Sequence, residues 1–251
     1  MIWNKRFEYP NSQRSIKGEY DISRMLLPSV TTDVILSLNT ALREEKRKTL
    51  DKWVRRVGES EADRIKNLAA KRGTAMHFYL QQWLDPNVKG YQDLTVVGQV
   101  AEPMAKKIIE KGIEDLTEVW GSEVTVHYPG LYAGATDLVC EHDGLDTVVD
   151  FKQSNRPKRE EWIEDYYLQI AAYAMAHDYV YKSKIRQGII MVCTPDCYYQ
   201  EFKFKDGELR RWKHEFLKRL DSYYDLKKDY KEEAQIDTHA LLAEFEKEGK
   251  K

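Results

Sequence analysis

The chain has 251 residues, 42% of them hydrophobic, which is enough for one large core or two small ones. Its formal net charge of −2 excludes nucleic-acid binding through an overall positive charge. A nucleic acid would have to bind at local basic patches. No apolar run approaches the roughly 20 residues that a membrane-spanning helix needs, so no membrane partner is expected.

Cysteine usage and the first residues indicate the compartment. The three cysteines, Cys140, Cys193 and Cys197, give no disulfide framework, which favours an intracellular protein. Three thiols cannot supply the usual four ligands of an iron–sulfur cluster, so no cluster is expected. The opening run MIWNKRFEYPNSQRS has neither the apolar core of a secretory signal nor a clear Arg-rich transit peptide. These features favour a bacterial or phage-infected cytoplasm over a mitochondrion.

Hydrophobic spacing divides the chain into a helical first part and a mixed second part. Residues 30–115 have mostly helical spacing, in segments at 33–50, 61–84 and 98–114. The pattern then predicts strands at 123–126, 132–140 and 147–151, a helix at 160–181, strands at 186–194 and 198–204, and a helix at 208–228. The last 20 or so residues are charged and are expected to fray. We therefore expect an N-terminal helical region at 1–115, a core at 116–232 and a charged tail at 233–251.

The strands at 132–140 and 147–151 are separated by HDG and so predict a β-hairpin. Asp143-Gly144 suits a two-residue type I′ turn, because both central residues of that turn have positive φ. The turn sets a register in which Asp137 lies directly opposite Asp150, with Lys152 on the same face. A bulge or a longer turn would shift this register by one residue.

Both faces of the same hairpin are apolar. In the predicted register, Val139 and Val148 share one face, and Leu138 and Val149 share the other. A sheet that is apolar on both faces is covered on both faces. The hairpin therefore predicts a helix–sheet–helix layering of the α/β class.

Two carboxylates held face to face repel each other unless one takes up a proton or a cation lies between them. Mg²⁺ and Mn²⁺ prefer oxygen ligands, so Asp137 and Asp150 together predict a divalent-metal site. Lys152 could then orient or deprotonate a water, or neutralise charge on a phosphate oxygen. The alternative is an ordinary ion pair of Lys152 with either aspartate, and these residues alone leave both interpretations open.

Three further features surround this pair. His77 lies in a helical segment, where a single histidine is more often a surface or core residue than a ligand. Gln169 and Tyr173 are four residues apart and share one helix face, from which they could hold a phosphate or a water. The loop after Lys152 is basic and could follow a phosphate backbone, although such charge runs are usually only solvated; its candidate DNA-binding residues are Ser154, Arg156 and Lys158.

Taken together, these motifs resemble the PD-(D/E)xK nuclease superfamily in its RecB-like branch. That branch carries Gly-Thr-x-x-His, Gly-x-x-Asp, Asp-x-Lys and Gln-x-x-x-Tyr in this order, and the chain has GTAMH at 73–77, GATD at 134–137, DFK at 150–152 and QIAAY at 169–173. Within the branch, the sequence is most similar to the mitochondrial genome maintenance exonucleases and their phage relatives, which also share LPSVTT at 27–32. The resemblance covers about residues 27–195.

The resemblance implies a restriction-endonuclease-like core, a mixed sheet flanked by helices, with Mg²⁺- or Mn²⁺-dependent cleavage of DNA. It implies that His77, Asp137, Asp150 and the backbone carbonyl of Phe151 are metal ligands. Lys152 would orient water or stabilise charge, and Gln169 and Tyr173 would support the substrate phosphate. Two positions limit the match: Gln81 stands where the family often has an acid, and Glu123 is a further candidate ligand whose register the sequence does not set.

For the substrate, the resemblance implies single-stranded DNA with a free end, threaded under an arch formed by the helices before residue 115. The run PSVTTD at 28–33 has the hydroxyls and the acid of a helix start, so Ser29 and Thr31 are candidate phosphate contacts. Two alternatives remain open: an RNA endonuclease of the cap-snatching kind, which also combines His, Asp and Lys, and a nucleic-acid-binding module without catalysis.

Overall fold

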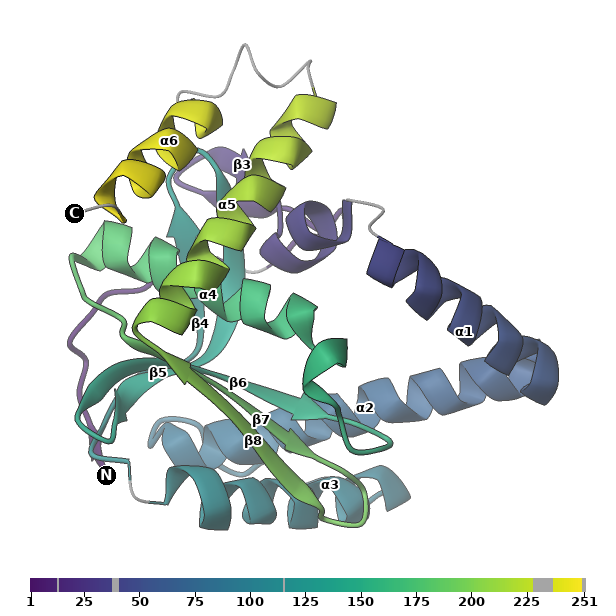
Figure 1. Ribbon diagram of the computed structural model, residues 1–251. Coiled ribbons are helices and arrows are strands. Elements are labelled where there is room, and N and C mark those ends of the chain that lie inside the picture. The colour runs from purple at the N-terminus through teal and green to yellow at the C-terminus, as the bar shows by residue number, and fades with distance from the viewer. Residues whose placement is uncertain (13, 38–40, 115, 228–236, 250–251) are drawn as a thin grey trace.

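The computed structural model describes residues 1–12, 14–37, 41–114, 116–227 and 237–249. At its centre is a six-stranded mixed sheet in the order β1-β4-β5-β6-β7-β8 (Figure 1). The strands are β1 (Ile2–Trp3), β4 (Glu118–Tyr128), β5 (Tyr132–His142), β6 (Leu145–Gln153), β7 (Gln187–Cys193) and β8 (Tyr199–Lys205). The pairs β1–β4 and β6–β7 are parallel, and the other neighbours are antiparallel.

Helices cover both faces of the sheet, as expected. One face carries α2 (Glu59–Leu84) and α3 (Val96–Ile108), and the other carries α4 (Glu164–Tyr181) and α5 (Gly207–Leu226) (Figure 1). Val139 and Val148 pack in the core with α4 and α5, whereas Leu138 and Val149 pack in the core with α2 and α3. The predicted division of the hairpin's apolar residues between two faces is therefore confirmed.

The β5–β6 hairpin has the predicted register. Asp143 and Gly144 form the turn with φ of 54° and 72°, and the strand pairs run from His142 with Leu145 to Leu138 with Val149. Asp137 and Asp150 follow immediately beyond the last recorded pair. The two strands thus separate at the two aspartates, which leaves an opening in the sheet at this point.

Helix α4 connects β6 to the parallel strand β7 and packs deeply into the core. Residues 167–177 are all buried, and the small side chains of Ala171, Ala172 and Ala174 let the helix lie close to the sheet. Such a crossover is required between parallel neighbours. It also brings Gln169 and Tyr173 to the face of β6 that carries Asp150.

The N-terminal region is not purely helical, which corrects the expectation for residues 1–115. Ile2 and Trp3 form the edge strand β1 beside β4, and β2 (Tyr20–Ile22) pairs with β3 (Met25–Leu27) in a small hairpin. The helices then begin with a short π-helix, η1 (Val30–Ile35), and end with another, η2 (Ile109–Ile113). Two-residue pairing with a strand far along the chain leaves no local hydrophobic pattern, so the sequence could not reveal β1.

Helix α1 (Ala41–Val57) and the first half of α2 project from the body of the molecule as a pair (Figure 1). None of residues 43–57 is buried. Lys46 Nζ, in the second turn of α1, lies 3.4 Å from Asp165 Oδ2 in the first turn of α4, so this end of α1 contacts the body. No helix in the described ranges is both long and apolar enough to cross a membrane.

The end of the chain differs from the expected frayed tail. Residues 238–248 form α6 (Thr238–Glu248), which packs on α5. Asp237 accepts hydrogen bonds from the backbone N–H groups of His239 and Ala240 and so caps the helix. The Arg210 guanidinium stacks over the Phe245 ring at 4.4 Å. The high charge of this segment predicted fraying, but a charged segment can still form an amphipathic helix that packs through its apolar side chains.

Candidate active site

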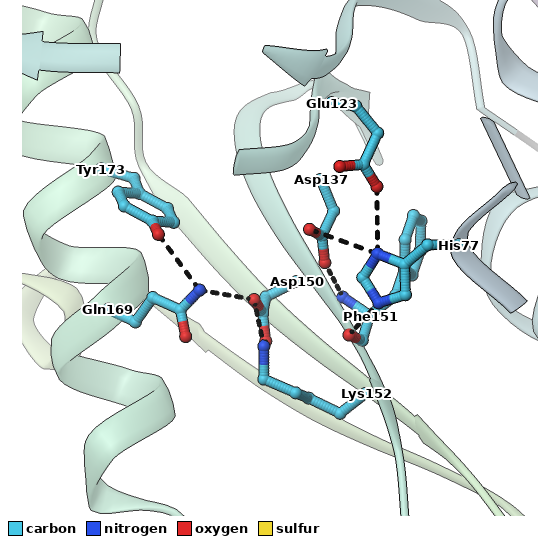
Figure 2. Close-up of polar contacts among 8 residues, drawn as sticks. All are labelled: His77, Glu123, Asp137, Asp150, Phe151, Lys152, Gln169 and Tyr173. Carbon is cyan, nitrogen blue, oxygen red and sulfur yellow. Dashed lines mark hydrogen bonds and ion pairs between the residues drawn. The ribbon is translucent and has the colours of Figure 1, made fainter. Parts of the chain in front are cut away.

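The candidate site lies where β5 and β6 separate, with α2 on one side and α4 on the other (Figure 2). His77 reaches it from α2. Its Nδ1 is 3.0 Å from Glu123 Oε1 and 3.6 Å from Asp137 Oδ1, and its Nε2 is 3.0 Å from the Phe151 carbonyl oxygen. The helix that carries GTAMH and the strands that carry GATD and DFK therefore meet at one point.

Glu123 reaches the site because the β4 backbone is irregular. The register of β4 against β5 shifts between Val119 and Gly121, and Glu123 has a φ of 52°, a left-handed conformation that is uncommon outside glycine. Its carboxylate accepts a hydrogen bond from His77 Nδ1. The sequence named Glu123 as a candidate but could not place it, because neither the shift nor the positive φ has a local signal.

The charges around His77 explain its protonation. Burial by itself lowers the pKa of the His77 imidazole, but the carboxylates of Asp137 and Glu123 raise it to about 9. The protonated ring donates from Nδ1 to Glu123 and from Nε2 to the Phe151 carbonyl. In this form the ring supplies the positive charge that two nearby acids require.

A second chain of polar contacts runs from β6 to α4. Lys152 Nζ donates to Asp150 Oδ1 at 2.6 Å, and Gln169 Nε2 donates to the same oxygen at 2.9 Å. Gln169 Nε2 also lies 3.2 Å from Tyr173 Oη. The ring of Tyr166, which the sequence analysis did not single out, lies 5.1 Å from Lys152 Nζ. The ammonium group is thus held between a carboxylate and an aromatic face.

Burial shifts the ionisation of this chain. It raises the pKa of Asp150 to about 6; Lys152 opposes that rise and Asp137 adds to it. Burial also raises the pKa of Asp137, against the effect of His77. For Lys152, burial lowers the pKa, but Asp150 and Asp137 outweigh it and raise the value. The lysine is therefore a cation near neutral pH.

The donor groups fit a divalent cation. One ligand atom each from His77, Glu123 and Asp137 lies within 4.8 Å of the others, and the Phe151 carbonyl is beside them. Carboxylate and carbonyl oxygens suit Mg²⁺ and Mn²⁺, and an imidazole suits Mn²⁺ better than Mg²⁺. Asp150, predicted as a ligand, lies outside this group and instead contacts Lys152 and Gln169.

A second group of potential ligands, Asp221, Asp225 and His239, lies between α5 and α6. None of these residues belongs to a motif, and His239 is mostly exposed. The group at the β5–β6 opening contains His77 of GTAMH and Asp137 of GATD, so we take it as the candidate metal site.

Gly134 links two of the motifs. A Cβ atom at this position would lie 2.5 Å from Tyr173 Cε1, closer than a real contact allows. The glycine of GATD therefore leaves room for the tyrosine of QIAAY, and the two motifs fit together through packing as well as through polar contacts.

Arg72, one residue before GTAMH, joins α2 to the end of β6. Its Nε donates to Gln153 Oε1 at 2.8 Å, and its Nη2 donates to Asn155 Oδ1. The side chain is buried, and burial lowers the pKa of its guanidinium. Sequence reasoning missed this residue, because an arginine on a helix has no signal that distinguishes a buried position.

The predicted DNA contacts lie in two places. Ser29 is buried at the start of η1 and its hydroxyl lies 3.3 Å from that of Thr31, so a phosphate contact by Ser29 would require this segment to open. Ser154 is also buried and donates to the Arg156 carbonyl. Arg156 is exposed, and Thr31 and Lys158 are partly buried, which leaves these three as the accessible members.

Comparisons with known proteins give relatives by sequence. No family model matches the chain. Human mitochondrial genome maintenance exonuclease 1 is 27% identical over 240 residues, which are 90% of this chain and 66% of the relative. The mouse protein of that name is 27% identical over 83% of this chain and 62% of its own. The Xenopus tropicalis protein of that name is 34% identical over 51% of this chain and 38% of its own length. The chain thus spans less than two thirds of these relatives.

Two solved structures align with part of the chain at low TM-scores. A protein named SSO0001 aligns with a TM-score of 0.38 and 14% identity over 78% of this chain and 74% of its own. An alkaline exonuclease from Laribacter hongkongensis aligns with a TM-score of 0.31 and 13% identity over 67% of this chain and 100% of its own. The chain is thus a homologue, at 27% identity, of proteins named mitochondrial genome maintenance exonuclease 1, and its mixed sheet flanked by helices fits the PD-(D/E)xK type of fold that the four motifs predict.

Proposed function

We propose that the protein is a divalent-metal-dependent exonuclease that hydrolyses the phosphodiester bonds of single-stranded DNA from a free end. One observation carries the proposal: four motifs that are far apart in the sequence converge at the β5–β6 opening (Figure 2). The names of the sequence relatives support the same reaction class.

In this proposal His77, Glu123, Asp137 and the Phe151 carbonyl would hold the ion. Asp150 would be a further ligand if Lys152 turned from it to the substrate. A bound Mg²⁺ or Mn²⁺ supplies positive charge for a phosphate oxygen and lowers the pKa of water. His77 gives up its proton to bind the ion, because only a neutral imidazole is a ligand.

The remaining residues of the site act on the phosphate. The Lys152 ammonium stabilises negative charge that develops on a phosphate oxygen, and preorganised groups of this kind usually contribute about 10²–10³ in rate. Asp150 and the ring of Tyr166 hold the ammonium before substrate binds. Gln169 and Tyr173 support the scissile phosphate from α4. The accessible cations Arg156 and Lys158 are positioned to contact the backbone of the strand.

The preference for a free end is supported by the projecting pair α1 and α2. None of residues 43–57 of helix α1 is buried, the helix is rich in lysine and arginine, and Lys46 near its start contacts Asp165 of α4. We infer that the single strand passes beneath this pair. A duplex would be too wide for the passage and a closed circle could not enter it.

The test uses labelled linear and circular single strands of DNA and RNA, each with Mg²⁺, Mn²⁺ or EDTA. We expect linear DNA to be degraded with either metal, and no cleavage with EDTA. Rapid cutting of RNA and of circles would instead indicate an endonuclease of the cap-snatching kind. Binding without cleavage under every condition would leave a nucleic-acid-binding module.

A further inference from the structure

An exposed tryptophan lies on the connection between β6, which carries Asp150 and Lys152, and α4, which carries Gln169 and Tyr173. Trp162 is 48% exposed, whereas the next residue, Ile163, is fully buried. The backbone N–H of Trp162 donates to the Arg159 carbonyl at 3.0 Å. Ile163 therefore anchors the connection in the core, and this anchoring together with the tight turn η3 (Glu160–Trp162) leaves the indole at the surface.

The chain on the N-terminal side of the indole is basic. The Arg159 guanidinium lies over its ring at 5.2 Å from the centroid. From residue 152 to residue 159 the chain has four basic side chains and no acid. Four acids flank Trp162, and each has a partner. Glu160 accepts a hydrogen bond from Tyr167, and Glu161 lies 3.7 Å from Arg159. Glu164 lies 2.8 Å from Arg219, and Asp165 lies 3.4 Å from Lys46. An aromatic face among cations is the usual composition of a surface that binds single-stranded nucleic acid.

The connection is held in place before any ligand binds. The Lys158 backbone N–H donates to Gln200 Oε1 at 2.6 Å, and Gln200 Nε2 donates to the Lys158 carbonyl at 2.9 Å. At its start, Arg72 holds Gln153 and Asn155. A preorganised surface loses less conformational entropy on binding than a loose loop does.

The position of the indole relates it to the reacting phosphate. Tyr166, whose ring contacts the Lys152 ammonium, follows Trp162 by four residues, and its backbone N–H donates to the carbonyl of the intervening Ile163 at 2.9 Å. A strand with one phosphate at Lys152 therefore has a neighbouring nucleotide within reach of the Trp162 ring.

We propose that Trp162 is a stacking platform for one base of the single-stranded DNA, next to the phosphate that is cleaved. This inference rests on the proposed function and adds a substrate contact to it. The indole stacks on the base, while Arg159 and its basic neighbours meet the backbone. Every base has a π-face, so the contact is tolerant of sequence. Removal of such an aromatic ring usually weakens binding about 5- to 150-fold per base.

The test measures binding of a labelled single-stranded oligonucleotide in Ca²⁺, in place of Mg²⁺, by fluorescence anisotropy. We expect Trp162→Ala to bind about tenfold more weakly than wild type, and Trp162→Phe to stay within about threefold, because a phenyl ring still stacks. The matched control is Tyr179→Ala at the other end of α4. Tyr179 is also an exposed ring, 44% accessible, with the Lys182 ammonium 4.8 Å from its centroid, and its loss should leave binding unchanged.

Oligonucleotides with one abasic site at successive positions separate stacking from a general effect on structure. Wild type should lose affinity when the abasic site falls at one position, and Trp162→Ala should not respond there. An equal response in both proteins, or wild-type binding by Trp162→Ala, would overturn the platform.

Cleavage of linear DNA by wild type is measured in parallel. If wild type cleaves linear DNA and Trp162→Ala binds the oligonucleotide as tightly as wild type does, the stacking platform is rejected and the exonuclease is kept. No cleavage, with binding that still depends on Trp162, rejects the exonuclease and keeps the platform.

Discussion

Helices α1 and α4 are nearly equal in length, 17 and 18 residues, and differ in almost everything else. Residues 167–177 of α4 are all buried, whereas none of residues 43–57 of α1 is. Helix α4 packs against the sheet and presents Gln169 to Asp150. Helix α1 projects from the body, with Lys46 as its contact to the start of α4 (Figure 1).

The difference separates two kinds of constraint on sequence. The side chains of α4 are selected by packing, so its polar residues are placed with the precision of the core. The side chains of α1 have no core to fill, so its many cations are set by other needs, such as contact with a polyanion: Arg43, Lys46, Arg47, Lys48, Lys52, Arg55 and Arg56. Changes near α4 should therefore abolish chemistry or stability, and changes on α1 should alter only access of the substrate.

The largest effect is expected where α4 holds the β6 residues. Asp150→Asn and Lys152→Ala should each lower the cleavage rate by at least about 10²–10³, because each removes a preorganised charge. Rates on linear single-stranded DNA give the measurement, and thermal unfolding gives the control for folding. A folded variant with near-normal activity would show that these residues are not part of the reaction.

The next effect tests the projecting pair. Circular single-stranded DNA should be cut at least about 100-fold more slowly than the same sequence after linearisation, because a strand without an end cannot be threaded. The rate ratio is compared on one preparation under identical metal and salt. Equal rates would mean that α1 and α2 are only a cover on the core and that the enzyme cuts internally.

A smaller effect is expected from the contact between α4 and β5. Gly134→Ala places a Cβ atom 2.5 Å from Tyr173 Cε1, so the helix or the ring must shift. Such overpacking usually costs about 1–3 kcal/mol, and we expect a melting temperature lower by several degrees and a rate about tenfold lower.

Gly207→Ala is the matched control for this change. Gly207 lies at the start of α5, and a Cβ atom there meets nothing within 4 Å. If both variants behave alike, the fit between Gly134 and Tyr173 does not matter to the site.

The hairpin and the face of α4 show what the sequence could predict. The pair Asp143-Gly144 demands a tight turn, and the turn sets the register that leads to Asp137 and Asp150. Four-residue spacing placed Gln169 and Tyr173 on one helix face, and they lie 3.2 Å apart. Both predictions needed only local geometry, which the residues themselves determine.

The parts that the sequence could not predict depend on distant contacts. Glu123 enters the site through a register shift and a positive φ, neither of which has a local pattern. The sequence also left open which aspartate pairs with Lys152. In the structure Lys152 and Gln169 both donate to Asp150, whereas His77 lies beside Glu123 and Asp137. The motifs showed which residues meet, but not which atoms contact each other.

Helix α2 joins the two regions, and its histidine gives a pH-dependent prediction. Because the pKa of His77 is raised to about 9, the ring is protonated at neutral pH and must lose its proton before it binds an ion. Affinity for Mn²⁺ should therefore rise about tenfold per pH unit between about pH 7 and pH 9. Titration calorimetry in buffers of different ionisation enthalpy measures both affinity and proton release. The dependence should flatten in His77→Ala, and an unchanged slope would remove the ring from the ligand set.

The smallest effect concerns the contact between α1 and α4. The Lys46–Asp165 ion pair is partly exposed, so it contributes little to stability. Burial lowers the pKa of Lys158, and the positive charge of Lys46 lowers it further. Lys46→Ala should weaken single-strand binding about two- to fivefold and reduce the salt dependence by about one phosphate contact. Its melting temperature should not change. Lys66→Ala on α2 removes a similar exposed pair, with Asp63, and should affect neither property; equal losses in both variants would mean that Lys46 acts through overall charge and that α1 has no specific place in the path of the strand.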